Sequence, residues 1–205
     1  MLTVTTAAED RTLLTLAEIR SAVGITDGSY TAELDALNDR VGAAITRACA
    51  VVGAGATLPT LRQEVLVETF RSVVCRRQLW LSRAPVVSIA SVVVDGATLD
   101  ADEYEADGWR LRRLYDDAEV EWSGTKITVS YTAGWSTVPD DLKLAASKLA
   151  RILWTEDGPG ARDPGLKREK TDGVDEREYW VAPSSDPLLS AEIAELLAPY
   201  INYGV

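Results

Sequence analysis

Apolar residues recur at spacings of three and four in two stretches near the N-terminus, which is the period of amphipathic helices. Thr15 precedes the first stretch with Glu18 three residues later, the spacing of a capping box, and Gly24 is suited to end that helix. Thr31 can cap the second stretch. The positions that share a face are Leu16, Ile19 and Val23 in the first helix and Leu34, Leu37, Val41, Ile45, Ala48 and Val52 in the second. We therefore predict an N-terminal pair of helices.

From Val65 onward the pattern changes to β-branched residues and alternation, which is typical of strands. Asp95-Gly96 and Ser123-Gly124 carry the signal of turns between strands. The candidate strands have the sequences EVLVETF, RQLWLS, VSIASVVV, RLRRLY, EVEW and KITVSYTAGW. Their lengths and spacing predict a small antiparallel sheet or barrel over residues 63–135.

A third helix is predicted to begin at Pro139, because proline suits the first turn and Asp140 and Asp141 then lie beside the positive end of the helix dipole. Its apolar stripe is Leu142, Ala146, Leu149 and Leu153. Residues 159–185 are rich in glycine, proline and charges of both signs, and are too polar to bury a face of their own. We expect them to form a flexible loop that becomes ordered against a partner.

A terminal helix is predicted within residues 186–205, because Asp186-Pro187 can start one. The apolar residues of one face are Leu189, Ile193, Leu196, Leu197 and Tyr200. A short helix that leaves such a face in water does not stay folded. Two arrangements remain open: the face binds the groove of a partner protein, or it packs on the helix of Leu142 to Leu153.

These elements predict an α+β fold with a mainly α-helical core, an inserted small antiparallel β-sheet subdomain and a C-terminal helix. The chain is divided accordingly into five parts. They are an N-terminal helical part (1–62), a β-rich insertion (63–135), a core helix (136–158), a charged flexible loop (159–185) and a C-terminal helix with its tail (186–205).

The charge of the chain disfavours binding to a nucleic-acid backbone. The 205 residues carry a net charge of −11, with 46% hydrophobic residues. Phosphate binding requires clustered Lys and Arg, whereas a surface of carboxylates lets DNA pass without adhering. The sequence has no apolar run of about 18 residues, and its N-terminus lacks the pattern of a secretory signal, so we expect a cytoplasmic protein without membrane contact.

The residues that carry most enzyme chemistry are scarce. Histidine is absent, which removes the usual general base and the commonest zinc ligand, and the two cysteines, Cys49 and Cys75, lack metal-ligand spacing. Gly53-Ala54-Gly55 lacks the Gly-Lys-Ser/Thr of a phosphate-binding loop. Four acidic residues are candidates for a cation site: Asp95, Asp100, Asp102 and Glu103. Two adjacent pairs are candidates for catalytic carboxylates: Asp116 with Asp117, and Asp140 with Asp141. None has a diagnostic spacing, and we predict no catalytic residue, metal ligand or cofactor.

Six tryptophans against a single phenylalanine are unusual, and tryptophan is enriched at contact hot spots. Four of them fall in or beside candidate strands, where core packing is the expected role: Trp80, Trp109, Trp122 and Trp135. Trp154 and Trp180 flank the charged loop, so burial in an interface is an equal alternative for these two. Together with the face of the terminal helix they form the predicted partner-binding set, Leu189, Ile193, Leu196, Leu197, Tyr200, Trp154 and Trp180.

Three pieces of the chain resemble the head-to-tail connector (adaptor) proteins of tailed phages, in the subgroup that has a β-rich insertion and occurs in long-tailed phages and gene transfer agents. They are RAPVVSIASV at Arg83 to Val92, Asp102-Glu103-Tyr104 after the predicted turn, and YTAGW with VPDDLK between Tyr131 and Lys143. The helix pair beginning LTLAEIRSAVGI adds to the resemblance, which extends from Leu14 to the end of the sequence.

The resemblance implies a structural role in the virion, after synthesis in the cytoplasm of the bacterial host. Such proteins form a ring, usually of twelve copies, that docks beneath the portal protein and presents a platform to tail-side neck proteins around the DNA channel. Two other functions remain open. One is a different neck or tail-completion protein without portal contact, and the other is a carboxylate-dependent glycan hydrolase, which requires a cleft with two carboxyls of opposed pKa.

Overall fold

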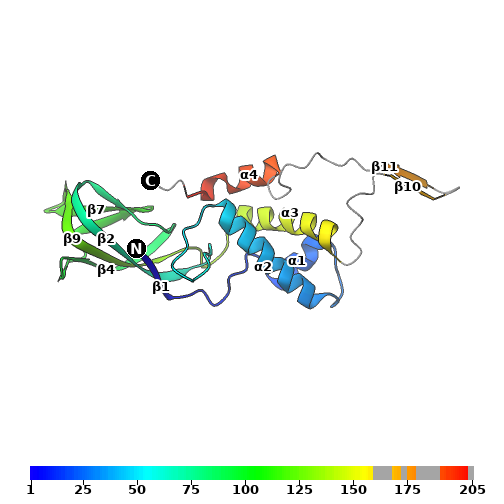
Figure 1. The fold of residues 1–205 in the computed structure, drawn as a ribbon, viewed down its shortest axis with the longest axis horizontal. Helices are drawn as coiled ribbons and strands as arrows, with labels where there is room; N and C mark the ends of the chain where they lie inside the picture. Colours follow the sequence, from blue (N-terminus) through cyan, green and yellow to red (C-terminus); the bar gives the residue numbers. More distant parts are fainter. Residues whose placement is uncertain (159–167, 172–174, 179–189, 203–205) are drawn as a thin grey trace. The chain divides into compact units, whose positions relative to one another are not determined.

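Two long antiparallel strands, β2 (Glu64–Arg76) and β9 (Trp122–Ala133), lie at the centre of the β region in the computed structural model (Figure 1). The structure describes residues 1–158, 168–171, 175–178 and 190–202. The chain divides into two compact units. The first comprises Met1–Arg11, Ile45–Pro139 and Pro199–Val205, and the second comprises Thr12–Ala44 and Asp140–Ala198.

The first unit contains two antiparallel sheets. A five-stranded sheet has the order β1-β2-β9-β4-β5, and a second sheet has the order β3-β7-β6 with β8 paired to β7. The remaining strands of the five-stranded sheet are β1 (Leu2–Thr6), β4 (Val86–Val94) and β5 (Ala97–Thr98). Those of the second sheet are β3 (Gln78–Trp80), β6 (Tyr104–Asp107), β7 (Arg110–Tyr115) and β8 (Ala118–Val120).

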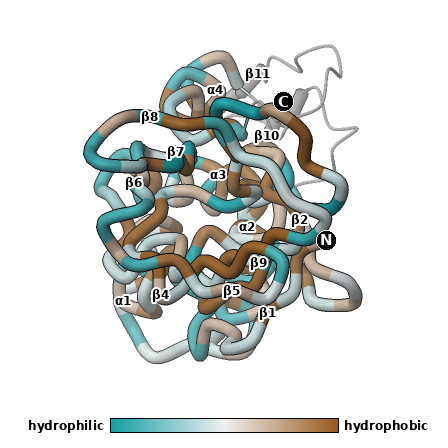
Figure 2. Tube along the Cα trace, turned by 90° about the vertical axis from the view of Figure 1, so that its left-hand side faces the viewer, coloured by the Kyte–Doolittle hydropathy of each residue, from teal (hydrophilic) through white to brown (hydrophobic). Residues whose placement is uncertain are grey.

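Alternation along the long strands builds the core of this unit. In β9, every second residue from Ile127 to Ala133 is buried, and Leu66 of β2 is buried beside them. Trp122 is fully buried, and its indole Nε1 donates a hydrogen bond to the carbonyl oxygen of Leu111 (3.0 Å). Hydrophobic segments, drawn in brown, lie among the strands labelled β4, β5 and β9 in Figure 2. The buried face of the sheets thus follows the period of two read from the sequence.

One of the two predicted turns is confirmed and the other is wrong. Asp95 and Gly96 both have positive φ (50° and 93°) and connect β4 to β5 as a two-residue hairpin loop. Ser123 and Gly124 instead lie inside β9. A Cβ on Gly124 would lie 3.1 Å from Cγ1 of Val94, so this glycine permits a close approach between neighbouring strands.

The second unit is built from helices α1 (Leu16–Val23), α3 (Asp140–Asp157), α4 (Ala191–Leu197) and most of α2 (Thr31–Ala48). The predicted capping box is confirmed, since the N–H of Thr15 donates to Oε2 of Glu18 (2.7 Å) and the N–H of Glu18 donates to the Thr15 hydroxyl (3.3 Å). Gly24 ends α1 in the left-handed region, as its position predicts. Nζ of Lys143 on α3 pairs with Oε1 of Glu18 at 2.7 Å, so α1 and α3 are joined by charge as well as by packing.

Helix α3 packs against both α1 and α4, and one face of α3 is an apolar stripe. The buried residues of this stripe are Leu142, Ala145, Ala146, Leu149, Ala150 and Leu153. Three of these six buried positions are alanine. No helix in the described part of the chain is both long and apolar enough to cross a bilayer.

The prediction of a mainly helical fold with a small β insertion is wrong. In the described part of the chain, strands account for 36% of the residues and helices for 32%, so the protein is α+β with strands slightly outnumbering helices. The prediction overlooked β1, where Leu2 and Val4 alternate with threonines and pack on the core of the first unit. Five residues of edge strand give too short a pattern to separate from coil by periodicity alone.

The predicted loop at residues 159–185 is described only where it forms two short strands. These are β10 (Arg168–Thr171) and β11 (Asp175–Glu178), which pair antiparallel. The other residues of the loop, and Asp186 to Leu189 of the predicted terminal helix, lie outside the described residues. Flexibility of this loop stays a prediction.

Candidate functional site

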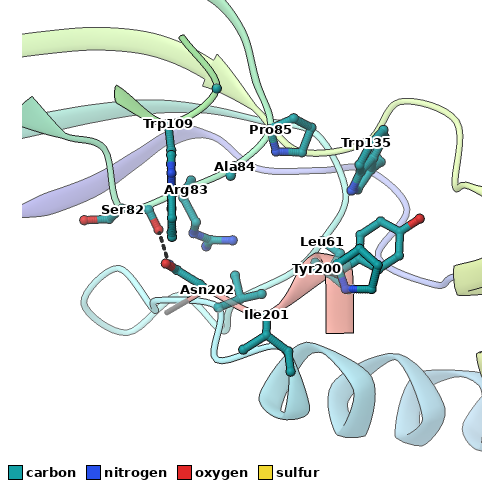
Figure 3. A pocket seen from close by; sticks show the side chains of 13 residues that line it. Leu61, Ser82, Arg83, Ala84, Pro85, Trp109, Trp135, Tyr200, Ile201 and Asn202 are labelled. Atoms are coloured by element: carbon teal, nitrogen blue, oxygen red, sulfur yellow. Dashed lines mark hydrogen bonds between the residues drawn. The ribbon is translucent and has the colours of Figure 1, made fainter. Parts of the chain in front are cut away.

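A pocket of about 250 Å³ in the first unit has aromatic walls (Figure 3). Trp109, Trp135 and Tyr200 supply the rings, and Arg83 is the one charged residue among those lining it. The apolar residues of the lining are Val51, Leu61, Ala84, Pro85, Pro199 and Ile201. A cavity of this kind binds an apolar or aromatic group and carries few groups for acid or base chemistry.

Connections between strands, and the segment after α4, bring these residues together. Gly108 and Trp109 lie in the β6–β7 connection, where Gly108 adopts a positive φ of 64°. Trp135 follows β9, and its ring meets that of Tyr200 edge-on, with centroids 6.0 Å apart. Trp109 meets Trp80 in the same way at 5.6 Å. Edge-to-face contacts of this kind favour a defined relative orientation of the two rings.

Asn202 ties the last described residues to the pocket. Its backbone N–H donates to the carbonyl of Cys49 (2.9 Å), and its side-chain amide donates to the carbonyl of Ser82 (3.1 Å). The second of these bonds is the dashed line in Figure 3. Both bonds use backbone carbonyls, so they fix the position of the chain itself at Pro199 to Asn202 against the pocket.

Arg83, which lines the pocket, belongs to a buried ion pair. Arg83 is 5% exposed; its Nη1 donates to the carbonyl of Thr60 (2.6 Å) and its Nη2 contacts Oε2 of Glu64 at 3.2 Å. Nη2 of Arg11 lies 3.8 Å from the other carboxylate oxygen of Glu64. Burial lowers the pKa of the Arg83 guanidinium, and the neighbouring Glu64 carboxylate partly offsets this effect. The pair is a structural element that holds the chain after β3 against the start of β2.

A second buried carboxylate holds Ser82, the residue before Arg83. Glu68 accepts hydrogen bonds from the N–H and hydroxyl of Ser82 and from the hydroxyl of Tyr131 (3.0 Å). Burial, reinforced by the charge of Glu68, raises the pKa of Tyr131 far above its usual value, so its hydroxyl remains a donor. Because Ser82 and Arg83 are both anchored from β2, the pocket wall is set by the five-stranded sheet.

The described residues offer no metal centre, since they contain no group of three or more His, Cys, Asp or Glu side chains placed to hold an ion. Asp116 and Asp117 form the turn between β7 and β8 with positive φ at both positions (51° and 60°). Asp140 and Asp141 open α3, as predicted. The acidic pairs weighed in the sequence therefore have local structural roles at a turn and at a helix N-terminus.

The terminal helix lies beside α3 in the second unit, and its binding to a partner stays a prediction. Ile193 and Leu197 are 1% and 2% exposed, and α4 packs on α3, with Nζ of Lys148 and Oε1 of Glu192 at 2.8 Å. Leu196 is half-buried. The helix is shorter than predicted: it begins at Ala191, after Ser190 as N-cap.

The other members of the predicted partner-binding set lie in different places. Tyr200 is half-buried against Trp135 in the pocket, and Trp154 is half-buried on α3 with its ring 5.8 Å from that of Tyr30. Leu189 and Trp180 lie outside the described residues. Of the five members that the structure describes, Tyr200 alone lines the aromatic pocket.

Sequence reasoning did not find the pocket. Trp109 and Trp135 were expected to serve only as core, and Arg83 was noted only within the RAPVVSIASV piece. The excess of tryptophan was the usable signal, because half-exposed tryptophans beside a buried arginine are common at binding surfaces. Their convergence required contacts between residues far apart in the sequence.

The two cysteines are expected to differ sharply in reactivity. Cys49 is fully buried, and burial raises its pKa to about 11, whereas Cys75 is exposed. At pH 8 only about one Cys49 thiol in a thousand is then the reactive thiolate. A thiol-reactive disulfide reagent should label one thiol per native chain and two after unfolding. Replacing Cys75 with serine should remove the native signal; labelling of two thiols in the native chain would contradict the burial of Cys49.

Solved structures share this fold along the whole chain. A chain from the neck of an empty gene transfer agent (GTA) particle with C6 symmetry matches with a TM-score of 0.60 and 20% identity, covering 100% of this chain and 97% of the other. Chains from the virion of the native GTA particle and from its neck with C12 symmetry match over the same extents, with TM-scores of 0.58 and 0.55 and identities of 20% and 19%. No protein-family model and no curated protein matches the chain.

Proposed function

We propose that this chain is a structural subunit of the neck of a gene transfer agent or phage-like particle. The observation that carries the proposal is the fold match to chains of GTA particles, which leaves only 3% of the matched chain uncovered. A match over the full length of both chains favours the same kind of subunit in both proteins. A single shared subdomain would leave long unmatched regions in one of the two chains. The function is one of assembly, in the virion neck, after synthesis in the host cytoplasm.

More narrowly, we propose a head-to-tail adaptor that forms a ring, of twelve copies in keeping with the resemblance, beneath the portal protein. Two of the matched neck structures have C6 and C12 symmetry, which supports a cyclic arrangement of this fold. The net charge of −11 suits a ring through which DNA passes without specific binding. The ring contacts the portal on one side and tail-side neck proteins on the other.

The residues proposed to contact partners are those of the predicted set that retain exposed surface. Trp154 on α3 and Leu196 on α4 are half-buried in the second unit, and Tyr200 is half-buried in the aromatic pocket of the first. Tryptophan and tyrosine with one covered side are the usual anchors of interfaces. Leu189 and Trp180 stay in the proposal as residues outside the described part.

Mixing the purified chain with the portal protein tests the adaptor assignment. We expect a complex whose mass, measured by mass photometry, equals one portal ring plus a ring of this chain. Trp154→Ala should weaken the complex at least tenfold, which corresponds to about 1.4 kcal/mol. Leu144→Ala, on the same helix and 48% exposed, is the matched control and should bind as the wild type does.

The outcome also separates the alternatives. Binding to tail-side neck proteins without binding to the portal would favour a different neck component. Failure to bind either class of protein, in a chain that is folded by circular dichroism, would refute a neck function.

A further inference from the structure

The two edges of the five-stranded sheet are open. At one edge, β1 pairs with β2 on one side only. At the other, β4 pairs with β9, and β5 covers only Val93 and Val94, so residues 86–91 have no second strand among the described residues. An open edge presents a row of backbone N–H and C=O groups that a further strand can use.

Neither edge carries the charges that usually prevent edge pairing. Charged residues make up 26% of the chain, yet β1 and β4 contain none, and neither contains a proline. Val87 is 57% exposed on the open part of β4. Register shifts at Val87 and Ala90 bend β4, and a further shift lies between Val4 and Thr6 of β1. Such bulges limit a new ladder on either edge to a few residue pairs.

The directions of the strands determine which partner fits. Each neighbouring pair in the series β1, β2, β9 and β4 is antiparallel, so β1 and β4 run in opposite directions. A β1 strand from a second copy, placed beside β4 by rotation about a ring axis, therefore continues the antiparallel alternation. The lengths also agree, since β1 has 5 residues and the open part of β4 spans residues 86–91.

The backbone groups of β1 that face outward can be identified. Met1 and Thr69 exchange two hydrogen bonds, each of 2.8 Å, which makes them a hydrogen-bonded pair. Because such pairs alternate along an antiparallel ladder, Thr3 directs its groups toward β2, and Leu2 and Val4 direct theirs to the open edge. Val4 thus directs an N–H to the open edge, where a carbonyl oxygen of a further strand can accept its hydrogen bond.

We propose that the sheet continues from one copy of this chain to the next, with the β1 edge of one copy paired to residues 86–91 of β4 in its neighbour. The two edges differ, so the contact is head-to-tail and uses each edge once per copy. Repetition of such a contact produces a closed ring when the rotation per copy divides a full turn. The inference rests on the proposed ring function and supplies its subunit interface.

Cysteine cross-linking within the assembled ring tests this pairing. In a Cys75→Ser background, Thr3→Cys is combined in turn with Val87→Cys, Ser88→Cys or Ala90→Cys, all at exposed positions. Oxidation of the ring should give a ladder of covalent oligomers on a non-reducing gel for at least one pair. Each single-cysteine variant is the control and should give none beyond a dimer. A ring that assembles without a ladder for any of the three pairs overturns the proposal.

Removing the outward N–H provides a second, independent readout. Val4→Pro should raise the concentration needed for half-assembly at least tenfold, because proline removes the donor at the open edge without affecting a bond to β2. Val4→Ala loses a comparable apolar contact, keeps the N–H and should assemble nearly normally. Equal assembly of the two variants overturns the edge pairing and leaves the neck function intact, whereas a wild-type chain that forms no ring refutes both.

Discussion

Replacing Arg83 with methionine is expected to lower the free energy of unfolding by about 3 to 5 kcal/mol. Methionine has an unbranched side chain that can fill much of the space of the arginine stem. The substitution removes the cation whose Nη2 lies 3.2 Å from Oε2 of Glu64. Glu64, only 2% exposed, is then left with Arg11 at 3.8 Å as its one ion-pair partner among the described residues. Chemical denaturation at neutral pH measures the loss.

The double substitution Arg83→Met with Glu64→Leu is the control for this prediction. A well-packed apolar pair replaces a buried ion pair at little net cost, so most of the lost stability should return. Recovery of the free energy of unfolding would show that the single substitution acts by leaving the buried Glu64 carboxylate without its cation. A single variant that loses less than about 1 kcal/mol would mean that water or Arg11 already compensates Glu64.

The double substitution Ile193→Asp with Leu197→Asp is expected to detach α4 from α3 and to lower the free energy of unfolding by several kcal/mol. Both side chains are buried, and burying each Leu or Ile contributes about 1.5 to 3 kcal/mol. Carboxylates at these positions also lose hydration if the helix stays packed. Thermal unfolding and hydrogen exchange of the amides in Ala191–Leu197 measure the two effects.

Ala191→Asp with Ala198→Asp adds the same two charges at exposed positions of the same segment and should leave stability nearly unchanged. The comparison decides between the two roles that the sequence left open for the terminal helix. If the buried-face variant melts as the wild type does but no longer joins the portal complex, the face is an attachment element. If it unfolds or aggregates, the face belongs to the core of the chain.

Local signals in the sequence were read correctly where neighbours in the chain supply the interaction. The capping box of Thr15 and Glu18 and the end of α1 at Gly24 depend on residues within one or two helical turns. The turn at Asp95-Gly96 depends on two positions that tolerate positive φ. The same signal at Ser123-Gly124 failed because Gly124 lies inside β9, where a Cβ would come 3.1 Å from Cγ1 of Val94, a residue distant in the sequence.

The amphipathic face of the terminal helix shows the limit of a periodic pattern. The spacing of Ile193 and Leu197 established that one side must be covered, and the structure places α3 there. A hydrophobic face has no directional preference, so the pattern cannot distinguish a partner from another part of the same chain. β1 posed the opposite problem, because a short edge strand has too little pattern to be recognised without β2 beside it.

By itself the sequence determined the starts of α1 and α3, most of the strands, the acidic charge and the lack of histidine chemistry, because each depends on residue type or on spacing along a few turns. Only the tertiary structure decided the aromatic pocket and the open sheet edges. The pocket joins Val51, Trp109 and Trp135 from three separate connections with Asn202 from the C-terminal segment. The edges depend on which strand lies last in the order of the sheet. Both follow from long-range pairing, whose contacts no local period encodes.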